Sequence, residues 1–328
     1  MNDRAAKSDK PDASAVQQKL ADIRLRDPFI LPVPEQGRYY LFGTGWRLPK
    51  GPGFMVYQST DLQTFLGPQV AFRRPEGFWS DRDYWAPEVH RYKGRFYMFA
   101  SFKAKGVCRG TQILSADAPA GPYRPHSKGP VTPRDWECLD GTLFVDEAGR
   151  PWMVFCHEWL QVGDGEMCAM PLRSDLSQAD GPPILLFRAS EASWVIESGK
   201  KRKGSGPTGR VTDGPFMHQT ASGALLMLWS SFGKRGYALA VARSKSGMLR
   251  GPWIHESKLL YENDGGHGMI FRTHDGTLML ILHQPNKGPH ERPRLFPLEE
   301  RGDRLAILRR QADATGSRPR PQPSGRKG

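Results

Sequence analysis

Short apolar runs recur along the chain, 53 to 73 residues apart, and a glycine-containing turn precedes each run. The runs are Tyr39–Phe42, Phe96–Phe99, Trp152–Phe155, Leu225–Leu228 and Leu278–Ile281. A short polar or acidic motif lies ahead of each turn, and the five motifs begin at Asp27, Ala86, Asp140, Asp213 and Gly266. Apolar runs of this length between turn residues are typical of buried strands, and no segment has a long helical period. The pattern therefore predicts five copies of a module built from short strands.

Two further features recur behind these runs. A third apolar strand follows in four copies, at Met55–Tyr57, Gln112–Leu114, Met167–Met170 and Tyr237–Ala240. A Gly-Pro dipeptide then announces an outer strand, at residues 67–68, 121–122, 181–182 and 251–252. A four-stranded module that repeats about every 50 residues is typical of propeller blades, whereas a β-sandwich gives no reason for such a repeat. We therefore expect an all-β protein, a five-bladed β-propeller with four-stranded antiparallel blades around a central funnel.

The same repeat divides the chain into regions. The propeller is expected to occupy residues 25–310 as a single domain, with disordered tails at 1–24 and 311–328. The longest interval, 73 residues, lies between the third and fourth modules. Removing about 20 residues there restores the period, so we expect an insertion loop at about 190–210.

The formal net charge of +13 is concentrated outside the predicted propeller. Residues 1–26 carry +2, residues 200–210 carry +5 and residues 309–328 carry +5, which leaves the body of the chain near neutrality. Such runs attract RNA weakly, but they contain none of the aromatic residues that a single-strand binding platform needs. Nucleic acid is therefore not an expected partner, although the basic segments keep it as an alternative.

Membrane and secretion signals are not evident in the sequence. No run approaches 18 apolar residues, and the polar N-terminus lacks the apolar segment of a secretory signal. We expect a cytoplasmic protein without a membrane partner, and the sequence leaves its oligomeric state open.

In an antiparallel blade, the start of the first strand and the end of the second strand lie on the same face. That face should collect Asp27, Glu88, Asp140, Asp213 and His267 from first strands. From the ends of second strands it should collect Trp46, Phe102, His157, Glu158, Trp159, Ser230, Ser231, His283 and Gln284. Carboxylates bond sugar hydroxyls and move protons, and aromatic faces stack on sugar rings. Although Asp-Gly alone is a common turn dipeptide, its shared position in the repeat favours a carbohydrate site.

At these motifs the chain resembles glycoside hydrolase family 43, five-bladed propeller enzymes that degrade arabinan and xylan. The resemblance runs from Leu25 to Leu308 and rests on five segments in order: Arg26–Ile30, Tyr84–His90, Leu139–Asp146, Thr212–Phe216 and Gly265–Met269. It implies an inverting hydrolase with Asp27 as general base and Asp140 as the residue that orients the acid and raises its pKa. It implies no cofactor for the chemistry, and it makes His267 a candidate for holding calcium or another ion at the propeller axis through water.

The chain departs from the family pattern at Asp213, where the general acid is usually a glutamate. Aspartate is one methylene shorter, and a misplacement of about 1 Å can lower a rate about 100-fold. Asp213 is one candidate for the acid, and Glu158 is another, with Asp213 then binding a sugar hydroxyl. The acid role is also open to Glu88, Glu191 or Glu197, and a sugar-binding propeller without catalytic activity is the remaining hypothesis.

The expected substrate is an oligosaccharide of the arabinose or xylose type. An exo-acting α-L-arabinofuranosidase fits a cytoplasmic enzyme best, with β-xylosidase and galactofuranosidase specificities as alternatives. The residues expected to bind the sugar are Trp46, Trp85, Glu88, Phe102, His157, Trp159 and Ser231.

Overall fold

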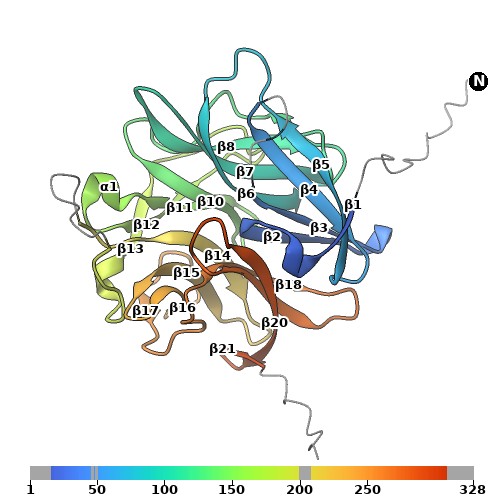
Figure 1. Ribbon diagram of the computed structural model, residues 1–328. Helices are drawn as coiled ribbons and strands as arrows, with labels where there is room; N and C mark the ends of the chain where they lie inside the picture. The colour runs from blue at the N-terminus through green and yellow to red at the C-terminus, as the bar shows by residue number, and fades with distance from the viewer. Residues whose placement is uncertain (1–15, 46–47, 49–50, 199–207, 309–328) are drawn as a thin grey trace, which may run out of the picture.

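The computed structural model describes residues 16–45, 48, 51–198 and 208–308, and its five β-sheets surround a common centre (Figure 1). Blade 1 contains β1 (Val16–Lys19), β2 (Arg26–Val33), β3 (Arg38–Thr44), β4 (Gly53–Ser59) and β5 (Thr64–Arg73). Blade 2 contains β6 (Arg82–Tyr92), β7 (Arg95–Ala104), β8 (Val107–Ala116) and β9 (Arg124–Pro125). Blade 3 contains β10 (Cys138–Val145), β11 (Pro151–His157), β12 (Glu166–Pro171) and β13 (Ile184–Arg188).

Blades 4 and 5 complete the ring. Blade 4 contains β14 (Asp213–Gln219), β15 (Leu225–Gly233), β16 (Gly236–Ser244) and β17 (Trp253–His255). Blade 5 contains β18 (Gly266–Arg272), β19 (Leu278–Gln284), β20 (Arg292–Arg301) and β21 (Arg304–Ile307). The helices are η1 (Leu20–Asp22), η2 (Pro34–Gln36), α1 (Trp159–Val162) and η3 (Ala189–Glu191). None of the helices in the described part of the chain has the length and apolar character needed to cross a membrane.

The innermost strands form a closed ring. β2 contacts β6, β6 contacts β10, β10 contacts β14, β14 contacts β18, and β18 contacts β2 (Figure 1). Each sheet is antiparallel, and each of blades 2 to 5 runs outward from this ring in the order of the sequence. The predicted five-bladed β-propeller is therefore confirmed.

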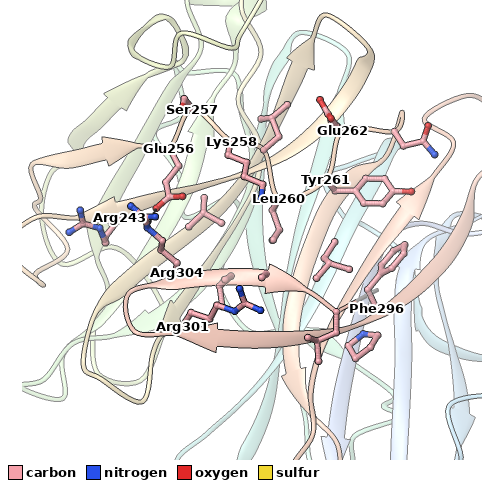
Figure 2. Close-up of a pocket in the computed structure, with 18 of the residues that line it drawn as sticks. Arg243, Glu256, Ser257, Lys258, Leu260, Tyr261, Glu262, Phe296, Arg301 and Arg304 are labelled. Carbon is pink, nitrogen blue, oxygen red and sulfur yellow. Dashed lines mark ion pairs between the residues drawn. The ribbon is translucent and has the colours of Figure 1, made fainter. Parts of the chain in front are cut away.

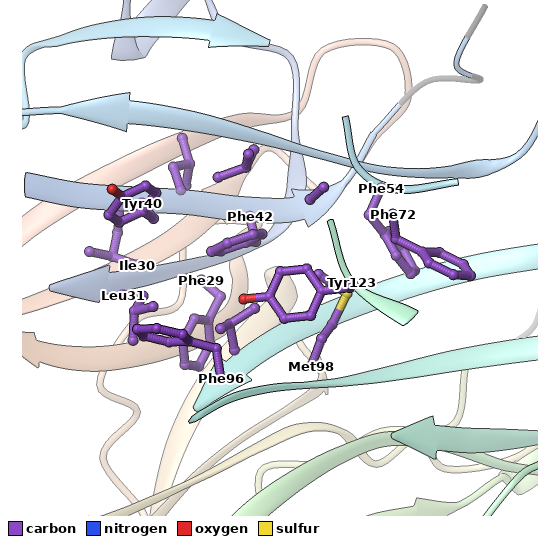
Figure 3. Close-up of a cluster of buried hydrophobic side chains, with 14 of the residues drawn as sticks. Phe29, Ile30, Leu31, Tyr40, Phe42, Phe54, Phe72, Phe96, Met98 and Tyr123 are labelled. Atoms are coloured by element: carbon purple, nitrogen blue, oxygen red, sulfur yellow. The ribbon is translucent and has the colours of Figure 1, made fainter. Parts of the chain in front are cut away.

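The core lies between neighbouring blades. One apolar cluster joins residues of blades 1, 2 and 5, including Phe29, Phe42, Phe96 and Met98 (Figure 3). Further clusters lie between blades 2 and 3, between blades 3 and 4, and between blades 4 and 5. Because a blade packs on a neighbour at each face, both sides of its middle strands are buried. Every residue of β11 is accordingly buried, which explains why these strands read as continuous apolar runs.

The N-terminal boundary differs from the sequence prediction. Residues 16–24, assigned to a disordered tail, include β1 and η1, and β1 pairs with the outer strand β5. Gln18 also donates a hydrogen bond from its side chain to the Gly67 carbonyl at 3.2 Å. Blade 1 therefore has five strands. The rest of the predicted N-terminal tail, the C-terminal tail at 311–328 and residues 199–207 of the predicted insertion lie outside the described residues.

Side chains at the junction of blades 1 and 5 close the ring. Glu291 is buried and pairs with Arg26 at 3.2 Å and with Arg24 at 3.9 Å. The second guanidinium nitrogen of Arg26 donates to Asn286 at 2.7 Å. Among the described residues the two blades share no strand, so side-chain contacts such as these and the apolar packing hold the first blade to the last.

We expect Glu291→Ala to lower the free energy of unfolding by about 1–2 kcal/mol, because it removes the buried carboxylate that contacts Arg26. Asp303→Ala is a matched control, since it removes the partner of Arg243 from a more exposed pair at 3.1 Å. That variant should lose less than about 1 kcal/mol. Urea unfolding followed by circular dichroism measures both values, and an equal loss in the two variants would contradict this account of ring closure.

Candidate active site

Each innermost strand begins with a β-bulge. The register to the second strand shifts just after Arg26, Leu139, Asp213 and Gly266, and on both sides of Trp85 in β6. The residue that follows each of these five has a left-handed backbone: Asp27, Ala86, Asp140, Gly214 and His267, with φ between 44° and 56°. A left-handed conformation is uncommon for residues other than glycine, and it is most often adopted by Asn, Asp and His. Because bulges redirect side chains, these five positions determine which side chains face the propeller axis.

The backbone amides at the bulges are bonded across blades. Four of them contact a side chain at the end of the second strand in the preceding blade. The pairs are Asp27 N–His283 Nδ1 at 3.2 Å, Ala86 N–Thr44 Oγ1 at 2.7 Å, Asp140 N–Ser101 Oγ at 2.9 Å and His267 N–Ser230 Oγ at 2.8 Å. A buried amide needs an acceptor, so these bonds fix each bulge to the neighbouring blade.

Blade 4 follows a different arrangement. The second-strand position of blade 3 that matches Thr44 and Ser101 is Cys156, which lies opposite Leu139. A thiol is a weak acceptor. The Gly214 amide instead donates to Oδ2 of Asp140 at 3.0 Å. Glycine is required here, because a Cβ on Gly214 would come within 2.7 Å of the His267 ring. The acidic residue of blade 4 is consequently Asp213, one position before the bulge residue.

Three carboxylates from three blades meet around His267. Its Nδ1 lies 3.2 Å from Oδ1 of Asp27 and 3.7 Å from Oδ2 of Asp140. Oδ2 of Asp27 accepts a hydrogen bond from Thr44 at 2.7 Å, and Oδ2 of Asp213 accepts one from Tyr237 at 3.0 Å. Asp27 and Asp140 therefore lie together at His267, and Asp213 lies within electrostatic reach of Asp140 and His267.

The pKa values of these carboxyls are shifted in opposite directions. Burial acts to raise the pKa of Asp27, but the neighbouring His267, Arg26, His283 and Thr44 outweigh it and lower the pKa to about 2. Burial, and then the negative charge of Asp140, raise the pKa of Asp213 to about 7. Burial also raises the pKa of Asp140 to about 6, against the effect of His267. Near neutral pH, Asp27 is therefore an ionised acceptor, whereas Asp213 can hold a proton.

The carboxylates of this cluster act on the pKa of His267. Burial acts to lower its pKa, but Asp27, Asp140 and Asp213 outweigh burial, so the pKa is raised. Within the described residues, no group of three or more His, Cys, Asp or Glu side chains is arranged to hold a metal ion. The residues present therefore do not form an ion cage, and an ion held by His267 through water stays a prediction.

Glu158 lies at the end of β11, outside this cluster, in an ion pair. It contacts Nη1 of Arg109, whose Nη2 lies 2.8 Å from Asp83. The Arg109 guanidinium stands over the ring of Trp85 at 4.3 Å, and Trp85 keeps 36% of its surface exposed. Burial, opposed by Arg109, raises the pKa of Glu158 to about 7. The charge of Asp213 also raises this pKa, so the two carboxyls lie within electrostatic reach of each other.

The other glutamates proposed as acids each have a partner of their own, and the charge of Glu88 also reaches Asp140 and His267. Glu88 is buried deeper along β6, 3.3 Å from Nε2 of His90. Glu191 accepts a hydrogen bond from the Arg188 amide at 2.8 Å, and Glu197 lies 3.5 Å from Arg210.

Several residues expected to bind sugar are placed differently from the prediction. Phe102 is fully buried among Phe72, Tyr84 and other rings, and Ser231 is also fully buried. His157 is buried and stacks on Trp136 with ring centroids 4.2 Å apart. Phe102 and Ser231 are packed in the protein and do not line an open face, whereas His157 and Glu88 are as buried as Asp140, and their roles in sugar binding stay predictions.

The remaining sugar-binding candidates are Trp85, Trp159 and Trp46. Trp159 begins α1 and lies against Gly209, Trp85 is open to solvent, and Trp46 lies outside the described residues.

The sequence interpretation missed several neighbours of the carboxylates. Thr44 and Tyr237 bond Asp27 and Asp213 directly, and Arg109 links Glu158 to Asp83. The repeat holds a signal for one further residue, since Ser101 stands one residue before Phe102, and of the expected pair Ser230 and Ser231 it is Ser230 that bonds the bulge. Because side chains alternate across a strand, a slip of one residue selects the wrong face.

A large groove lies apart from the carboxylates, on the outer edge of blades 4 and 5 (Figure 2). It has a volume of about 1120 Å³, and Tyr261, Phe296 and several arginines line it. Its arginines are paired with carboxylates: Arg235 with Glu262, Arg243 with Asp303, Arg301 with Glu299 and Arg304 with Glu256. The groove shares no residue with the carboxylate cluster, where the shifted pKa values indicate the chemistry.

Comparison with known proteins identifies the family of the chain. The model of the glycosyl hydrolases family 43 matches residues 20–304. The chain belongs to glycosyl hydrolase family 43. The predicted glycoside hydrolase activity is therefore confirmed at the level of the family, and membership implies a carbohydrate substrate.

Relatives of this family-43 enzyme include two with named activities. A solved structure of an endo-arabinase from Bacteroides thetaiotaomicron is 42% identical, with a TM-score of 0.80, covering 86% of this chain and 97% of that one. An extracellular exo-α-(1→5)-L-arabinofuranosidase of Cellvibrio japonicus is 27% identical over 298 residues, covering 80% of this chain and 79% of that protein. A thermostable family-43 glycoside hydrolase, 22% identical with a TM-score of 0.72, shares the fold over 94% of this chain and 98% of that one.

In the family-43 enzyme, Asp140→Asn should lower the pKa of Asp213 from about 7, because it removes the nearest negative charge but keeps an acceptor for the Gly214 amide. Carboxyl-carbon NMR titration measures this pKa. Asp117→Asn, a change at an exposed residue of blade 2, is the control and should leave the titration unchanged. A pKa of Asp213 that does not move in Asp140→Asn would contradict the electrostatic coupling.

Proposed function

We propose that this family-43 enzyme is an inverting hydrolase of arabinose-type oligosaccharides, with Asp27 as general base and Asp213 as general acid. The observation that supports the proposal most strongly is the opposite shift of two clustered carboxyls, with a pKa of about 2 for Asp27 and about 7 for Asp213. Pairs of titratable groups whose environments separate their pKa values are typical of acid and base partners. Asp140 raises the pKa of the acid and holds the Gly214 amide next to it.

The proposed reaction is a single displacement. Asp27 takes a proton from a water molecule as the water oxygen attacks the anomeric carbon. The bond from that carbon to the glycosidic oxygen breaks, and Asp213 donates its proton to this leaving oxygen. The anomeric configuration is inverted, and no cofactor takes part in these steps.

Asp213 fits the acid role better than Glu158. Both have a pKa raised to about 7, but Glu158 is held in an ion pair by Arg109. Asp213 lies in the same cluster as the proposed base, and its charged neighbours are Asp140, His267 and Asp27. Glu158 remains the alternative acid, and the shorter side chain of Asp213 keeps a sugar-binding protein without catalytic activity as the second candidate function.

The arabinose assignment draws on the named relatives. The endo-arabinase and the exo-arabinofuranosidase both act on arabinose-containing substrates by their names, although they differ in mode. We propose that the enzyme cleaves α-L-arabinofuranosidic bonds and that it acts in the exo mode. Endo action is the alternative, and it is the mode in the name of the relative with the higher sequence identity. β-Xyloside and galactofuranoside specificities are the alternatives. A cytoplasmic location, and the absence of nucleic-acid and membrane partners, stay predictions.

The first test is hydrolysis of arabinobiose and 4-nitrophenyl α-L-arabinofuranoside, with the xyloside and galactofuranoside as comparisons. We expect wild-type turnover of the arabinosides, and proton NMR should show the inverted anomer first. Asp27→Asn should lower kcat about 100- to 10,000-fold without loss of the fold, while Asp117→Asn retains activity. Full activity in Asp27→Asn would contradict the base assignment, and no hydrolysis of any substrate would favour the sugar-binding alternative. A single small product from linear arabinan, rather than a range of lengths, would identify exo action.

The second test separates the two candidate acids. Nitrophenolate leaves without a proton, whereas the leaving sugar of arabinobiose needs one. Asp213→Asn should therefore lose far more activity on arabinobiose than on the nitrophenyl substrate, and Glu158→Gln should show no such difference. The wild-type kcat/KM should also fall as the pH rises above about 7, because the acid loses its proton there. A substrate-dependent loss in Glu158→Gln alone would transfer the acid role to Glu158.

A further inference from the structure

The hydroxyl of Tyr237 on β16 is directed at the proposed acid. It donates to Oδ2 of Asp213 at 3.0 Å, and the Tyr237 side chain is buried. Within the described part of the chain, no protein group donates a hydrogen bond to Oδ1 of Asp213. The two oxygens of this carboxyl therefore have different environments.

Tyr237 is fixed from several directions. Its ring stacks on His283 at 5.7 Å with an angle of 18° between the planes, and it packs on Phe232 at 5.3 Å. Its carbonyl accepts a hydrogen bond from the Gly265 amide at 2.9 Å. A Cβ on Gly266 would lie 2.7 Å from the Tyr237 ring, so the absence of a side chain there leaves room for the ring. The hydroxyl consequently has little freedom to leave Asp213.

We infer that Tyr237 is a positioning residue that keeps the catalytic proton on Oδ1 of Asp213 and holds this short side chain in the site. The inference rests on the proposed function, in which Asp213 is the acid. In a protonated carboxyl the carbonyl oxygen accepts hydrogen bonds better than the hydroxyl oxygen, so the oxygen that accepts from Tyr237 is the carbonyl and the acid proton resides on the other oxygen. Burial raises the pKa of Tyr237 well above its usual value, and the hydroxyl remains a donor throughout the working range.

The same bond affects the acidity of Asp213. Donation from Tyr237 stabilises the carboxylate and lowers its pKa, whereas burial, Asp140 and Asp27 raise it and His267 lowers it. Loss of the hydroxyl alone should therefore raise the pKa of Asp213. The alkaline limb of the activity profile should then move to higher pH, a change that a purely structural role for Tyr237 would not produce.

The test compares Tyr237→Phe with Tyr123→Phe. Tyr123 is also buried, and its hydroxyl donates to the Pro119 carbonyl at 2.8 Å, so the control removes the same atom from a bond outside the site. In Tyr237→Phe, kcat for arabinobiose should fall about 10- to 100-fold, while kcat for 4-nitrophenyl α-L-arabinofuranoside changes less than about 3-fold. The alkaline limb for arabinobiose should move upward in Tyr237→Phe and stay in place in Tyr123→Phe.

Equal losses on the two substrates, or an alkaline limb that does not move, would overturn the inference. If Tyr237→Phe fails to fold by circular dichroism, Tyr237→Met fills similar space without a hydroxyl and should show the same difference between substrates. Failure of the proposed function is a separate outcome, because it requires that the wild type hydrolyses neither arabinoside or that Asp213→Asn keeps full activity on arabinobiose. If Tyr237→Phe keeps normal activity on arabinobiose while Asp213→Asn loses it, only the role of Tyr237 is rejected.

Discussion

The site depends on one backbone constraint, the bulge that begins each innermost strand. A bulge places a residue in the left-handed region and leaves an amide that must find an acceptor in the interior. In four blades a side chain from the preceding blade supplies the acceptor, so the bond that satisfies the backbone also joins neighbouring blades. Thr44 serves both ends of this arrangement, since its hydroxyl accepts from the Ala86 amide and donates to Asp27. Local backbone geometry, ring assembly and carboxylate orientation are thus fixed by the same contacts.

Blade 3 breaks the pattern at Cys156, with a chemical consequence. Because a thiol is a weak acceptor, the Gly214 amide bonds to Asp140 instead. This bond brings the carboxylate of Asp140 next to blade 4, where its charge helps to raise the pKa of Asp213. A hydroxyl in place of Cys156 would offer the amide a competing acceptor. Cys156, the exception in the repeat, therefore lies at the position where a weak acceptor allows Asp140 to couple to Asp213.

The sequence predicts the fold and the three aspartates well, because the apolar period and the polar motifs follow directly from the blade. It predicts the surroundings of the aspartates poorly. Phe102 is one residue away from Ser101, which bonds a bulge, and of the expected pair Ser230 and Ser231 only Ser230 does so. Periodicity locates a strand but does not determine which of two alternating residues faces the axis. Asp213 lies one position before Gly214, a shift that only the bulge reveals. Tyr237 and Arg109 lie on third strands, where apolar neighbours conceal polar contacts across the blade.

Protonation of Asp213 lowers the negative charge of the cluster. Asp27 and Asp140 act on His267, whose pKa they raise, and Arg26 interacts with both Asp27 and Glu291. In the proposed reaction Asp213 loses a proton as Asp27 gains one, and the total charge does not change. Burial therefore does not oppose turnover, although it strongly opposes a second ionised aspartate without a partner. After product release, a proton on Asp27, with a pKa of about 2, is held far more weakly than one on Asp213, with a pKa of about 7. The environment that separates the two pKa values thus also returns the enzyme to its starting protonation state.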